Sequence, residues 1–527
     1  MLRYIYHLQS KDLSLVHAMI PLGSCTMKLN STASMVPLTM PGFGAIHPFA
    51  PLDQTEGYQQ LIKELEGDLC VITGFHAMSL QPNSGAQGEF AGLSVIKAYL
   101  ESTGQGHRDI CLIPVSAHGT NPASAAMAGL KVVPVKVLAN GELDMPDLRA
   151  KAEQYKDKLA AFMVTYPSTF GVFEDGVQEA CEIIHQAGGQ VYLDGANLNA
   201  QMGLTNPFVC GGDVCHLNLH KTFGIPHGGG GPGVGPIGVR KHLAPFLPSN
   251  PVVPTGGEQP IEAISAAPWG SASILTISWA FIKMLGGDGI TDSAKISILS
   301  ANYIAKRLDG HYKLRYSNSK GRVAHELLLD LAEFDASAGL KVMDFAKRLQ
   351  DFGIHPPTCS WPISTGMLIE PTESEGLAEI DRFCDAMIQI RKEVQLVIDG
   401  KQPKHDNIIS HAPHTVAIMT EPHWTRPYTR AEAAYPLPWL RQQKFWPSTG
   451  RIDDGEWRLP SSGLVLASSS VADSLPPHSS LYPFANKFTV IRTSSASAPR
   501  SRSSPSQARS DRPPPLPGEP PLSGPFS

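Results

Sequence analysis

The sequence predicts an α/β protein in which helices cover both faces of a mostly parallel sheet. Short apolar runs alternate with helix-like stretches from about residue 81 to residue 239. This alternation implies right-handed crossovers between parallel strands. The chain has 527 residues, of which 42% are hydrophobic and 17% charged, so it can bury a large core. Because ligands on such sheets bind at the carboxyl ends of strands, functional residues are expected there.

Individual elements follow from local patterns. Five runs are short, rich in branched side chains and bounded by turn residues, which predicts buried strands at 110–115, 131–137, 160–166, 190–193 and 214–219. Helical spacing predicts helices at 121–130, 145–155 and 177–187. Gly188 and Gly189 follow the last of them as a helix-ending signal.

A second, smaller α/β region follows the first. One or two helices are expected at 276–308, then strands at 326–331 and 366–370 and helices near 342–352 and 374–397. Of the last 34 residues 19 are Ser or Pro, which predicts a disordered tail. Four divisions are predicted. Residues 1–60 form an N-terminal segment that serves the active site or a dimer, and residues 61–308 form a large ligand-binding domain. Residues 309–454 form a small C-terminal domain, and residues 455–527 form the tail.

Composition excludes several functional classes. The 43 basic and 48 acidic residues leave a charge of −5, which argues against nucleic acid as a partner. No run reaches the roughly 18 apolar residues of a membrane-spanning helix. Eight cysteines without a Cys-x-x-Cys pair favour a reducing compartment. Cys210, Cys215 and His216 form the one local cluster of metal-binding types, but their spacing does not complete a zinc site, so no metal is predicted.

Lys221 ends a strand-like run and precedes a glycine-rich loop at 228–235. A lysine placed at the end of a buried strand loses hydration, which frees its neutral amine to attack carbonyl groups. That is the requirement for a Schiff-base lysine. A surface lysine after an edge strand is the alternative that the pattern leaves open. A Walker phosphate loop is excluded because no glycine-rich stretch ends in Gly-Lys-Ser or Gly-Lys-Thr.

Asp194 ends another predicted strand, 27 positions before Lys221. A buried carboxylate needs a cationic partner, and a protonated pyridinium nitrogen would provide one. An acid that keeps this nitrogen charged lets the ring accept electrons, which is the chemistry of pyridoxal phosphate. An aspartate that only caps the following helix is the simpler interpretation.

Two further sites follow strands on the same edge of the predicted sheet. Ser84, Gly85, Ala86 and Gln87 have capping-box spacing before a helical stripe, so their open backbone N–H groups fit a cofactor phosphate. A plain capped helix explains the same pattern. His118 follows the strand at 110–115 and could stack on a flat ring, although a lone loop histidine is more often only solvated. Together with Lys221 and Asp194 these residues favour one cofactor pocket.

Five segments resemble a known family. They are 20–30 (IPLGSCTMKLN), 81–89 (QPNSGAQGE), 118–125 (HGTNPASA), 194–197 (DGAN) and 216–223 (HLNLHKTF). Read together, they resemble fold type I pyridoxal-phosphate enzymes. More narrowly, they are similar to the carboxy-terminal half of glycine dehydrogenase (decarboxylating), the P protein of the glycine cleavage system. The resemblance extends from about residue 1 to Asp454.

The resemblance implies a role for each matched position. Lys221 would carry pyridoxal 5'-phosphate, Asp194 would pair with the pyridinium nitrogen and His118 would stack on the ring. Ala196 would pack on the opposite ring face and residues 84–87 would hold the phosphate. Thr169, near the ring hydroxyl, and His220, beside Lys221, are further expected cofactor contacts.

The family's activity is implied in the same way. Glycine would lose CO₂, and its aminomethyl remainder would pass to the lipoyl arm of the H protein, as in an oxidoreductase that uses lipoamide as acceptor. The implied partners are the other components of the glycine cleavage system and a second copy of the chain in a homodimer. The implied compartment is the mitochondrion, although residues 1–7 do not resemble a transit peptide.

Two departures from the family are visible. The chain starts well inside the layout of the eukaryotic family, whose amino-terminal half has a similar fold. Past Asp454 the family continues with a Cys-containing segment, whereas residues 455–527 resemble nothing in it and are interpreted as read-through of noncoding sequence. Both departures place the activity of this form of the chain in question.

Other functions remain open from sequence. Another fold type I enzyme, such as an aminotransferase or a carbon–sulfur lyase, would share the cofactor residues. A truncated chain could act only as a dimerisation partner. A polyproline ligand at residues 514–517 is a fourth alternative, with chance spacing in a Pro-rich tail as its competitor. Arg426 and Arg430 are candidates to orient the substrate carboxylate, with surface arginines as the simpler interpretation.

Overall fold

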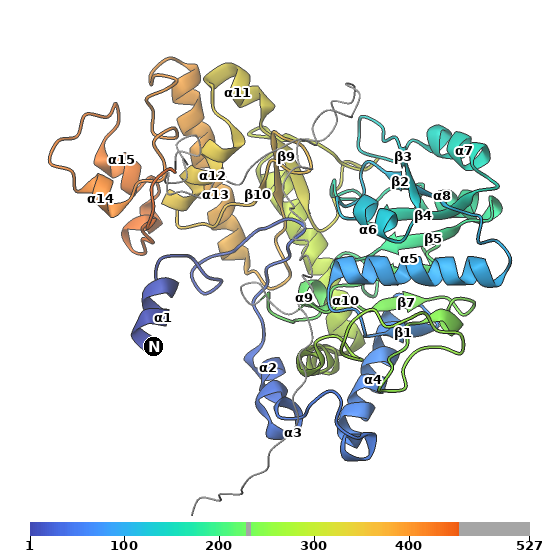
Figure 1. Cartoon of the computed structure of the whole chain (residues 1–527). Coiled ribbons are helices and arrows are strands. Elements are labelled where there is room, and N and C mark those ends of the chain that lie inside the picture. Colours follow the sequence, from blue (N-terminus) through green and yellow to red (C-terminus); the bar gives the residue numbers. More distant parts are fainter. Residues whose placement is uncertain (228–232, 453–527) are drawn as a thin grey trace, which may run out of the picture. The chain divides into compact units, whose positions relative to one another are not determined.

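A computed structural model describes residues 1–227 and 233–452 of the chain (Figure 1). These residues belong to one compact unit, Met1–Asp454, built around two sheets. The tail predicted to be disordered, 455–527, lies outside the described residues. Within the described part of the chain, no helix combines the length and apolarity needed to cross a lipid bilayer.

The larger sheet has seven strands in the order β1-β7-β6-β5-β4-β2-β3. Only β7 runs antiparallel to its neighbours, β1 and β6, and the remaining pairs are parallel. The strands are β1 (Ala77–Ser79), β2 (Ile110–Pro114), β3 (Lys131–Val135), β4 (Leu159–Thr165), β5 (Gln190–Asp194), β6 (Val214–His216) and β7 (Ile237–Val239). The predicted fold class, a mostly parallel sheet in an α/β protein, is confirmed.

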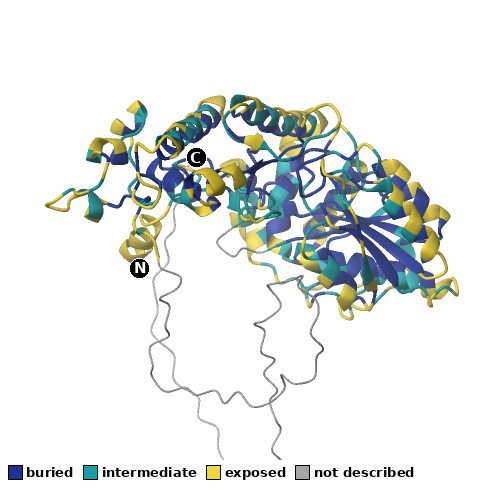
Figure 2. Cartoon of the chain, turned by 90° about the horizontal axis from the view of Figure 1, so that it is seen from above, coloured by how far each residue is buried: buried dark blue, intermediate teal, exposed yellow. Residues whose placement is uncertain are grey.

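Helices pack on both faces of this sheet because alternate side chains of each strand point to opposite sides. Cys111 and Ile113 pack with α5 and α6, whereas Leu112 of the same strand packs with α7 and α8. Figure 2 shows the strands as a buried layer between helices with exposed outer faces. These helices are α5 (Gly85–Ser102), α6 (Asn121–Met127), α7 (Met145–Gln154) and α8 (Val177–Gln186). Gly188 follows α8 with a φ of 80°, so the predicted helix-ending glycine is confirmed.

The strand predicted at 214–219 is wrong in its second half. β6 ends at His216, and α9 (Leu219–Thr222) forms one helical turn that contains Lys221. Leu217 and Leu219 are both fully buried. A short apolar run has the same appearance in a buried strand and in a buried helical turn, so its periodicity could not separate the two.

The second sheet has four antiparallel strands in the order β10-β11-β9-β8. They are β8 (Lys313–Leu314), β9 (Leu327–Asp330), β10 (Thr358–Cys359) and β11 (Gly366–Ile369). The helices of this region are α10 (Leu275–Arg307), which leads into it, α11 (Ala332–Ala338), α12 (Val342–Asp351) and α13 (Leu377–Ile398). Gly286, with a φ of 62°, interrupts α10, in agreement with the prediction of one or two helices there.

The N-terminal segment reaches the second sheet. Leu22 forms a β-bridge with Ile369, and Gly23 N–H donates to the carbonyl of Leu368 at 3.3 Å. This contact places Ser24 beside Glu326, just ahead of β9. The remaining elements are α1 (Leu2–Gln9), α2 (Thr32–Thr39), α3 (Pro41–Gly44), η1 (Leu52–Gln54), α4 (Glu56–Thr73), η2 (Ala244–Phe246), η3 (Ala272–Ile274), α14 (Val416–Met419), α15 (Arg430–Ala434) and η4 (Pro438–Arg441).

Arg348 of α12 joins three parts of the small-sheet region through a buried ion network. Its guanidinium, fully buried, donates to Glu393 at 2.8 Å, to Asp351 at 2.9 Å and to the carbonyl of Ala433 at 3.0 Å. We expect Arg348→Ala to lower the free energy of unfolding by about 3–5 kcal/mol, because two buried carboxylates would lose their cation. Urea unfolding measures this loss. Lys392→Ala, on the exposed side of α13, should change it by less than about 0.5 kcal/mol, and equal losses in both variants would contradict the expectation.

Candidate functional site

A cavity, here called the Lys221 cavity, lies at the carboxyl ends of the parallel strands. It holds about 380 Å³ of empty space, part of which is open to solvent. Its lining comes from the ends of β4 and β5, from α9, from the loop after β2, and from the segments just before β9 and after Gly23. The lining residues are Ser24, His118, Thr165, Tyr166, Pro167, Thr169, Asp194, Ala196, Asn197, Lys221, His325 and Glu326.

Asp194 and Lys221 therefore lie on one cavity, as the sequence predicted. Asp194 is 2% exposed at the end of β5. Its Oδ2 accepts from Asn121 Nδ2 at 3.0 Å and from Thr165 Oγ1 at 3.2 Å, and its Oδ1 accepts from the backbone N–H of Ala196 at 3.0 Å. These neutral donors satisfy the buried carboxylate without cancelling its charge.

The electrostatic environment keeps Asp194 ionised. Burial raises the pKa of this carboxyl, but His216, His118 and the hydrogen bonds from Asn121 and Ala196 outweigh it, so the pKa lies below its ordinary value. A charged acid of this kind can stabilise a cation inside the cavity. Burial lowers the pKa of His118 and of His216, and the nearby Lys221 adds to that lowering.

His216 supports Asp194 from behind the sheet edge. Its Nε2 lies 3.5 Å from Asp194 Oδ1, and its Nδ1 lies 2.9 Å from the hydroxyl of Tyr192. Burial lowers the pKa of His216 to about 4, so the ring is neutral at pH 7. A neutral imidazole whose Nδ1 accepts from the tyrosine can direct its Nε2–H toward the aspartate. The sequence analysis considered His216 only as a metal ligand and missed this position.

His118 lines the Lys221 cavity and is fixed from both sides. Its backbone N–H donates to Thr165 Oγ1 at 2.9 Å, and its Nδ1 lies 2.8 Å from Thr120 Oγ1. The Thr120 hydroxyl also meets Glu89 Oε1 at 2.5 Å. Burial and the charge of Asp194 raise the pKa of Glu89 to about 7. On its other side the His118 ring contacts Trp361, with ring centroids 5.7 Å apart.

The other predicted contacts fall into two groups. Thr169 and Ala196 line the Lys221 cavity, and the hydroxyl of Thr169 donates to the carbonyl of Ser116 at 2.8 Å. His220 and residues 84–87 do not line it. His220 instead packs against His227, with ring centroids 5.5 Å apart, and burial lowers its pKa to about 4.

The start of α5 nevertheless lies beside the segment that carries Lys221. A Cβ on Gly85 would stand 2.9 Å from Nδ2 of Asn218, three residues before Lys221. The Ser84 hydroxyl accepts from Gln87 N–H at 3.2 Å, and Gln87 Oε1 accepts from Asn83 N–H at 2.9 Å. The predicted helix cap is thus present. Among the described residues the backbone N–H groups of Gly85 and Ala86 have no acceptor.

The sequence analysis did not single out Glu326, His325 or Asn197. Asn197 Nδ2 donates to Thr26 Oγ1 and to Glu370 Oε1, both at 2.7 Å. Glu326 and His325 lie just before β9 and are each 3% exposed. In the sequence, His325 and Glu326 are visible only as two polar residues immediately before the apolar run 327–329. That pattern does not reveal that the second sheet faces Lys221.

Ser24 brings the N-terminal segment into the cavity. It adopts a left-handed backbone with a φ of 63°, which is uncommon for a residue with a side chain. In this conformation its N–H donates to Glu326 Oε2 at 3.0 Å. Local strain that is held by surrounding structure is often found at functional sites.

Arg426 and Arg430 do not lie at the Lys221 cavity. Arg430 donates to the carbonyl of Glu421, and both guanidinium groups stack on Trp424, at 5.5 and 5.1 Å from the ring centroid. The suggestion that they orient a substrate carboxylate in this cavity is therefore wrong. Both arginines lie near α14 and α15, which follow the elements of the second sheet along the chain.

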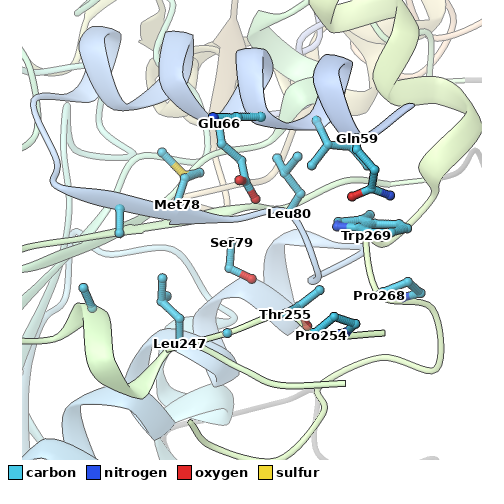
Figure 3. Close-up of a pocket in the computed structure, with 15 residues that line it drawn as sticks. Gln59, Glu66, Met78, Ser79, Leu80, Leu247, Pro254, Thr255, Pro268 and Trp269 are labelled. Carbon is cyan, nitrogen blue, oxygen red and sulfur yellow. The ribbon is translucent and has the colours of Figure 1, made fainter. Parts of the chain in front are cut away.

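A larger cavity of about 1060 Å³ lies between α4, β1 and the loops near residues 254 and 268 (Figure 3). Figure 3 shows the carboxylate of Glu66 pointing from α4 toward Ser79 of β1. Burial raises the pKa of Glu66 to about 7. No lining residue is shared with the Lys221 cavity, and neither a histidine nor a cysteine lines it.

Comparison with known proteins gives consistent results. Residues 293–414 match the family described as "Glycine dehydrogenase, C-terminal domain". The mitochondrial glycine dehydrogenase (decarboxylating) of Solanum tuberosum is 59% identical over 460 residues, and glycine dehydrogenase (decarboxylating) 1 of Arabidopsis thaliana is 58% identical over the same length. Each comparison covers 86% of this chain and 44% of the relative. The chain thus spans less than half the length of these curated relatives.

Solved structures share the fold. A crystal structure of a glycine decarboxylase (P-protein) in inhibitor-bound form superposes with a TM-score of 0.61 at 18% identity, covering 74% of this chain and 88% of that one. A cysteine desulfurase from Thermococcus onnurineus has a TM-score of 0.53 at 15% identity, covering 71% and 95%. By sequence this chain is thus similar to part of the mitochondrial glycine dehydrogenases (decarboxylating), and it shares its fold with these solved structures.

Proposed function

We propose that this chain forms the cofactor-binding, glycine-decarboxylating part of a glycine cleavage P protein. It would bind pyridoxal 5'-phosphate, release CO₂ from glycine and pass the aminomethyl group to the lipoyl arm of the H protein. The observation that carries the proposal is the placement of Lys221 and the ionised Asp194 on one cavity at the carboxyl ends of parallel strands. Similarity to the mitochondrial glycine dehydrogenases (decarboxylating) supports the choice of reaction.

The residues present fit this cofactor. Asp194 is a buried carboxylate that neutral donors surround, so a ring cation is the partner it lacks. The N–H groups of Gly85 and Ala86 open from the start of an 18-residue helix, where the helix dipole favours a phosphate. Between these two places Asn218 Oδ1 is buried and has no hydrogen-bond partner within the described part of the chain. The Ser84 hydroxyl, which accepts from the Gln87 N–H, and the Gln87 side chain, which accepts from the Asn83 N–H, would fix this turn.

Each remaining residue has a definite task in this proposal. Pyridoxal phosphate, when bound, supplies an electron-accepting ring conjugated to the amino group of the substrate. Lys221 would hold the cofactor and return to it after each turnover. His118 would cover one face of the ring and Ala196 the other, while Thr169 would lie near the ring hydroxyl. His220 would stiffen the turn that carries Lys221 through its contact with His227.

Asp194 would contribute most to the rate. Its fixed negative charge would hold a proton on the ring nitrogen of a bound cofactor. Because His216, Asn121 and the backbone of Ala196 are already oriented around it, no reorganisation is needed during the reaction. Preorganised electrostatics of this kind commonly provides the largest share of catalysis.

The proposed partners and compartment follow from the relatives. Glycine is the substrate, and the lipoylated H protein with the other glycine cleavage components completes the pathway. A homodimer and a mitochondrial location are part of the same proposal, since the curated relatives are named as mitochondrial proteins.

Bicarbonate exchange tests the reaction class. In the presence of lipoylated H protein, the purified chain is expected to incorporate labelled bicarbonate into the carboxyl group of glycine. Omission of the H protein should reduce exchange to background, because the lipoyl arm accepts the aminomethyl group. An aminotransferase or a carbon–sulfur lyase would bind the cofactor yet show no such exchange. Failure to bind the cofactor at all would leave only a non-catalytic role as a dimerisation partner.

A further inference from the structure

Two buried carboxyl groups meet at the wall of the Lys221 cavity that the second sheet provides. Glu326 precedes β9 and Glu370 follows β11, and they are 3% and 1% exposed. One oxygen of each carboxyl group and one ring nitrogen of His325 all lie within 4.8 Å of one another. Two negative charges so close in a buried place cannot both persist, so the pair is expected to share one proton near neutral pH.

Glu370 is the member that carries the charge. Its oxygens accept hydrogen bonds from Thr26 Oγ1 at 3.0 Å, from Asn197 Nδ2 at 2.7 Å and from Asn199 Nδ2 at 3.0 Å. Every one of these partners donates, which matches an ionised carboxylate that only accepts. Glu370 itself does not line the cavity.

Glu326 is the member that keeps the proton. Burial raises its pKa to about 8, and the charge of Glu370 adds to the rise, while the Ser24 N–H and Lys221 act in the opposite direction. Its Oε2 accepts a hydrogen bond from the Ser24 N–H. Its Oε1 has no hydrogen-bond partner within the described residues, and this oxygen is not fully buried. An acidic O–H is therefore available on the cavity side.

We propose that Glu326, as a neutral carboxylic acid, is the group that receives the carboxylate of the amino-acid substrate in the Lys221 cavity. This inference rests on the proposed function. No arginine lines the cavity within the described part of the chain, so a bidentate cationic clamp is absent from its wall. His325, beside Glu326, is also held neutral because burial lowers its pKa. The substrate carboxylate thus meets neutral donors on this side.

A neutral donor suits a decarboxylation for a physical reason. The substrate carboxylate is an anion at the start and becomes uncharged CO₂ at the end of the step. A salt bridge to it would stabilise the bound substrate more than the transition state and would raise the barrier. A hydrogen bond from an uncharged acid orients the carboxylate while costing less when the charge is lost. The ionised Glu370 lies next to Glu326, and it repels the substrate carboxylate. This repulsion also disappears when the carboxylate becomes CO₂.

The pH dependence of ligand affinity tests this inference. Binding is measured through the absorbance of the bound cofactor, with glycine and with methylamine, which has the amine but no carboxylate. The ratio of the two affinities isolates the carboxylate contribution from all titrations common to both amines. Between pH 7 and pH 9 this ratio is expected to fall about tenfold for the wild type, because only about one molecule in eleven keeps Glu326 protonated at pH 9.

Variants separate Glu326 from its neighbours. Glu326→Gln keeps a neutral donor at every pH, so its glycine-to-methylamine ratio should be high and flat, whereas Glu326→Ala should have a low ratio already at pH 7. The other groups that face Glu326 are Glu370, Lys221, His325 and Cys25, and they remain in both variants. A wild-type ratio without pH dependence, or an equal slope in Glu326→Gln, would overturn the inference.

Infrared spectroscopy provides a readout without cofactor. The unliganded wild type is expected to show a protonated-carboxyl band that weakens as pH rises through about 8, to which Glu174 also contributes because burial raises its pKa to about 8. Glu326→Gln should remove the Glu326 part of this band, and an unchanged band in that variant counts against the assignment. If the wild type shows bicarbonate exchange but its glycine-to-methylamine affinity ratio does not change with pH, this inference is refuted and the proposed function stands. A chain that binds no cofactor would refute both.

Discussion

Lys221→Ala is expected to abolish the pyridoxyl label that borohydride fixes in the cofactor-treated protein. Reduction converts the bond between a lysine amine and the cofactor aldehyde into a stable one, so the label marks the lysine that reacts. Lys221 is the lysine among the residues that line the cavity with Asp194. Peptide mapping of the reduced wild type should place the label within the segment that contains α9, and the variant should show none at that position.

A matched lysine variant controls for indirect effects. Lys241 is exposed and does not line the Lys221 cavity, so Lys241→Ala should retain the full label at Lys221. Thermal unfolding of both variants should stay close to that of the wild type, because neither side chain forms a buried ion pair within the described part of the chain. A label that maps to another lysine in the wild type would refute the assignment of Lys221.

Asp194→Asn is expected to preserve the fold and to reduce bicarbonate exchange by about 10²–10³-fold, the size associated with removal of one preorganised electrostatic group. Asparagine can keep the hydrogen bond from the Ala196 N–H but has no negative charge. The low pKa of Asp194 means that the wild-type acid is charged throughout the working pH range. The variant should therefore lose the proton on the ring nitrogen of a bound cofactor.

Nitrogen NMR of a labelled cofactor measures that proton without requiring turnover. The wild type should give the shift of a protonated ring nitrogen and Asp194→Asn that of a neutral one. Asp213→Asn is the control, because Asp213 is also buried, precedes the neighbouring β6 and pairs with Arg240 at 3.1 Å away from the cavity lining. Near-normal exchange in Asp194→Asn, or a protonated nitrogen in that variant, would exclude the electron-sink role.

The raised pKa of Glu326 also makes the stability of the fold depend on pH. Its folded-state pKa of about 8 exceeds the ordinary glutamate value of 4.5, so the folded protein binds a proton that the unfolded chain releases between these values. The favourable contribution is complete below pH 4.5 and is lost as the pH rises through about 8. Asp194, with a lowered pKa, contributes stability in the opposite sense, which is lost on acidification.

The predictable part of the site consists of residues at strand ends. Asp194 and His118 follow strands whose apolar runs are visible in the sequence, and parallel strands bring their carboxyl ends to one edge. Lys221 was found although its local structure was predicted incorrectly, because the strand β6 ends at the same edge whether extended chain or a helical turn follows it. The capped start of α5 was visible in the spacing of Ser84 and Gln87.

The sequence by itself determined the alternation of strands and helices, the edge of the sheet where chemistry belongs and the family to which its segments are similar, since each depends on local pattern. Only the tertiary structure decided which distant residues complete the cavity. Ser24 is 302 positions before Glu326 and still further from Glu370, and it meets them because Leu22 and Gly23 pair with β11. The protonation of Glu326 arises from that meeting, because burial and a neighbouring charge are properties of packing that no local sequence pattern contains.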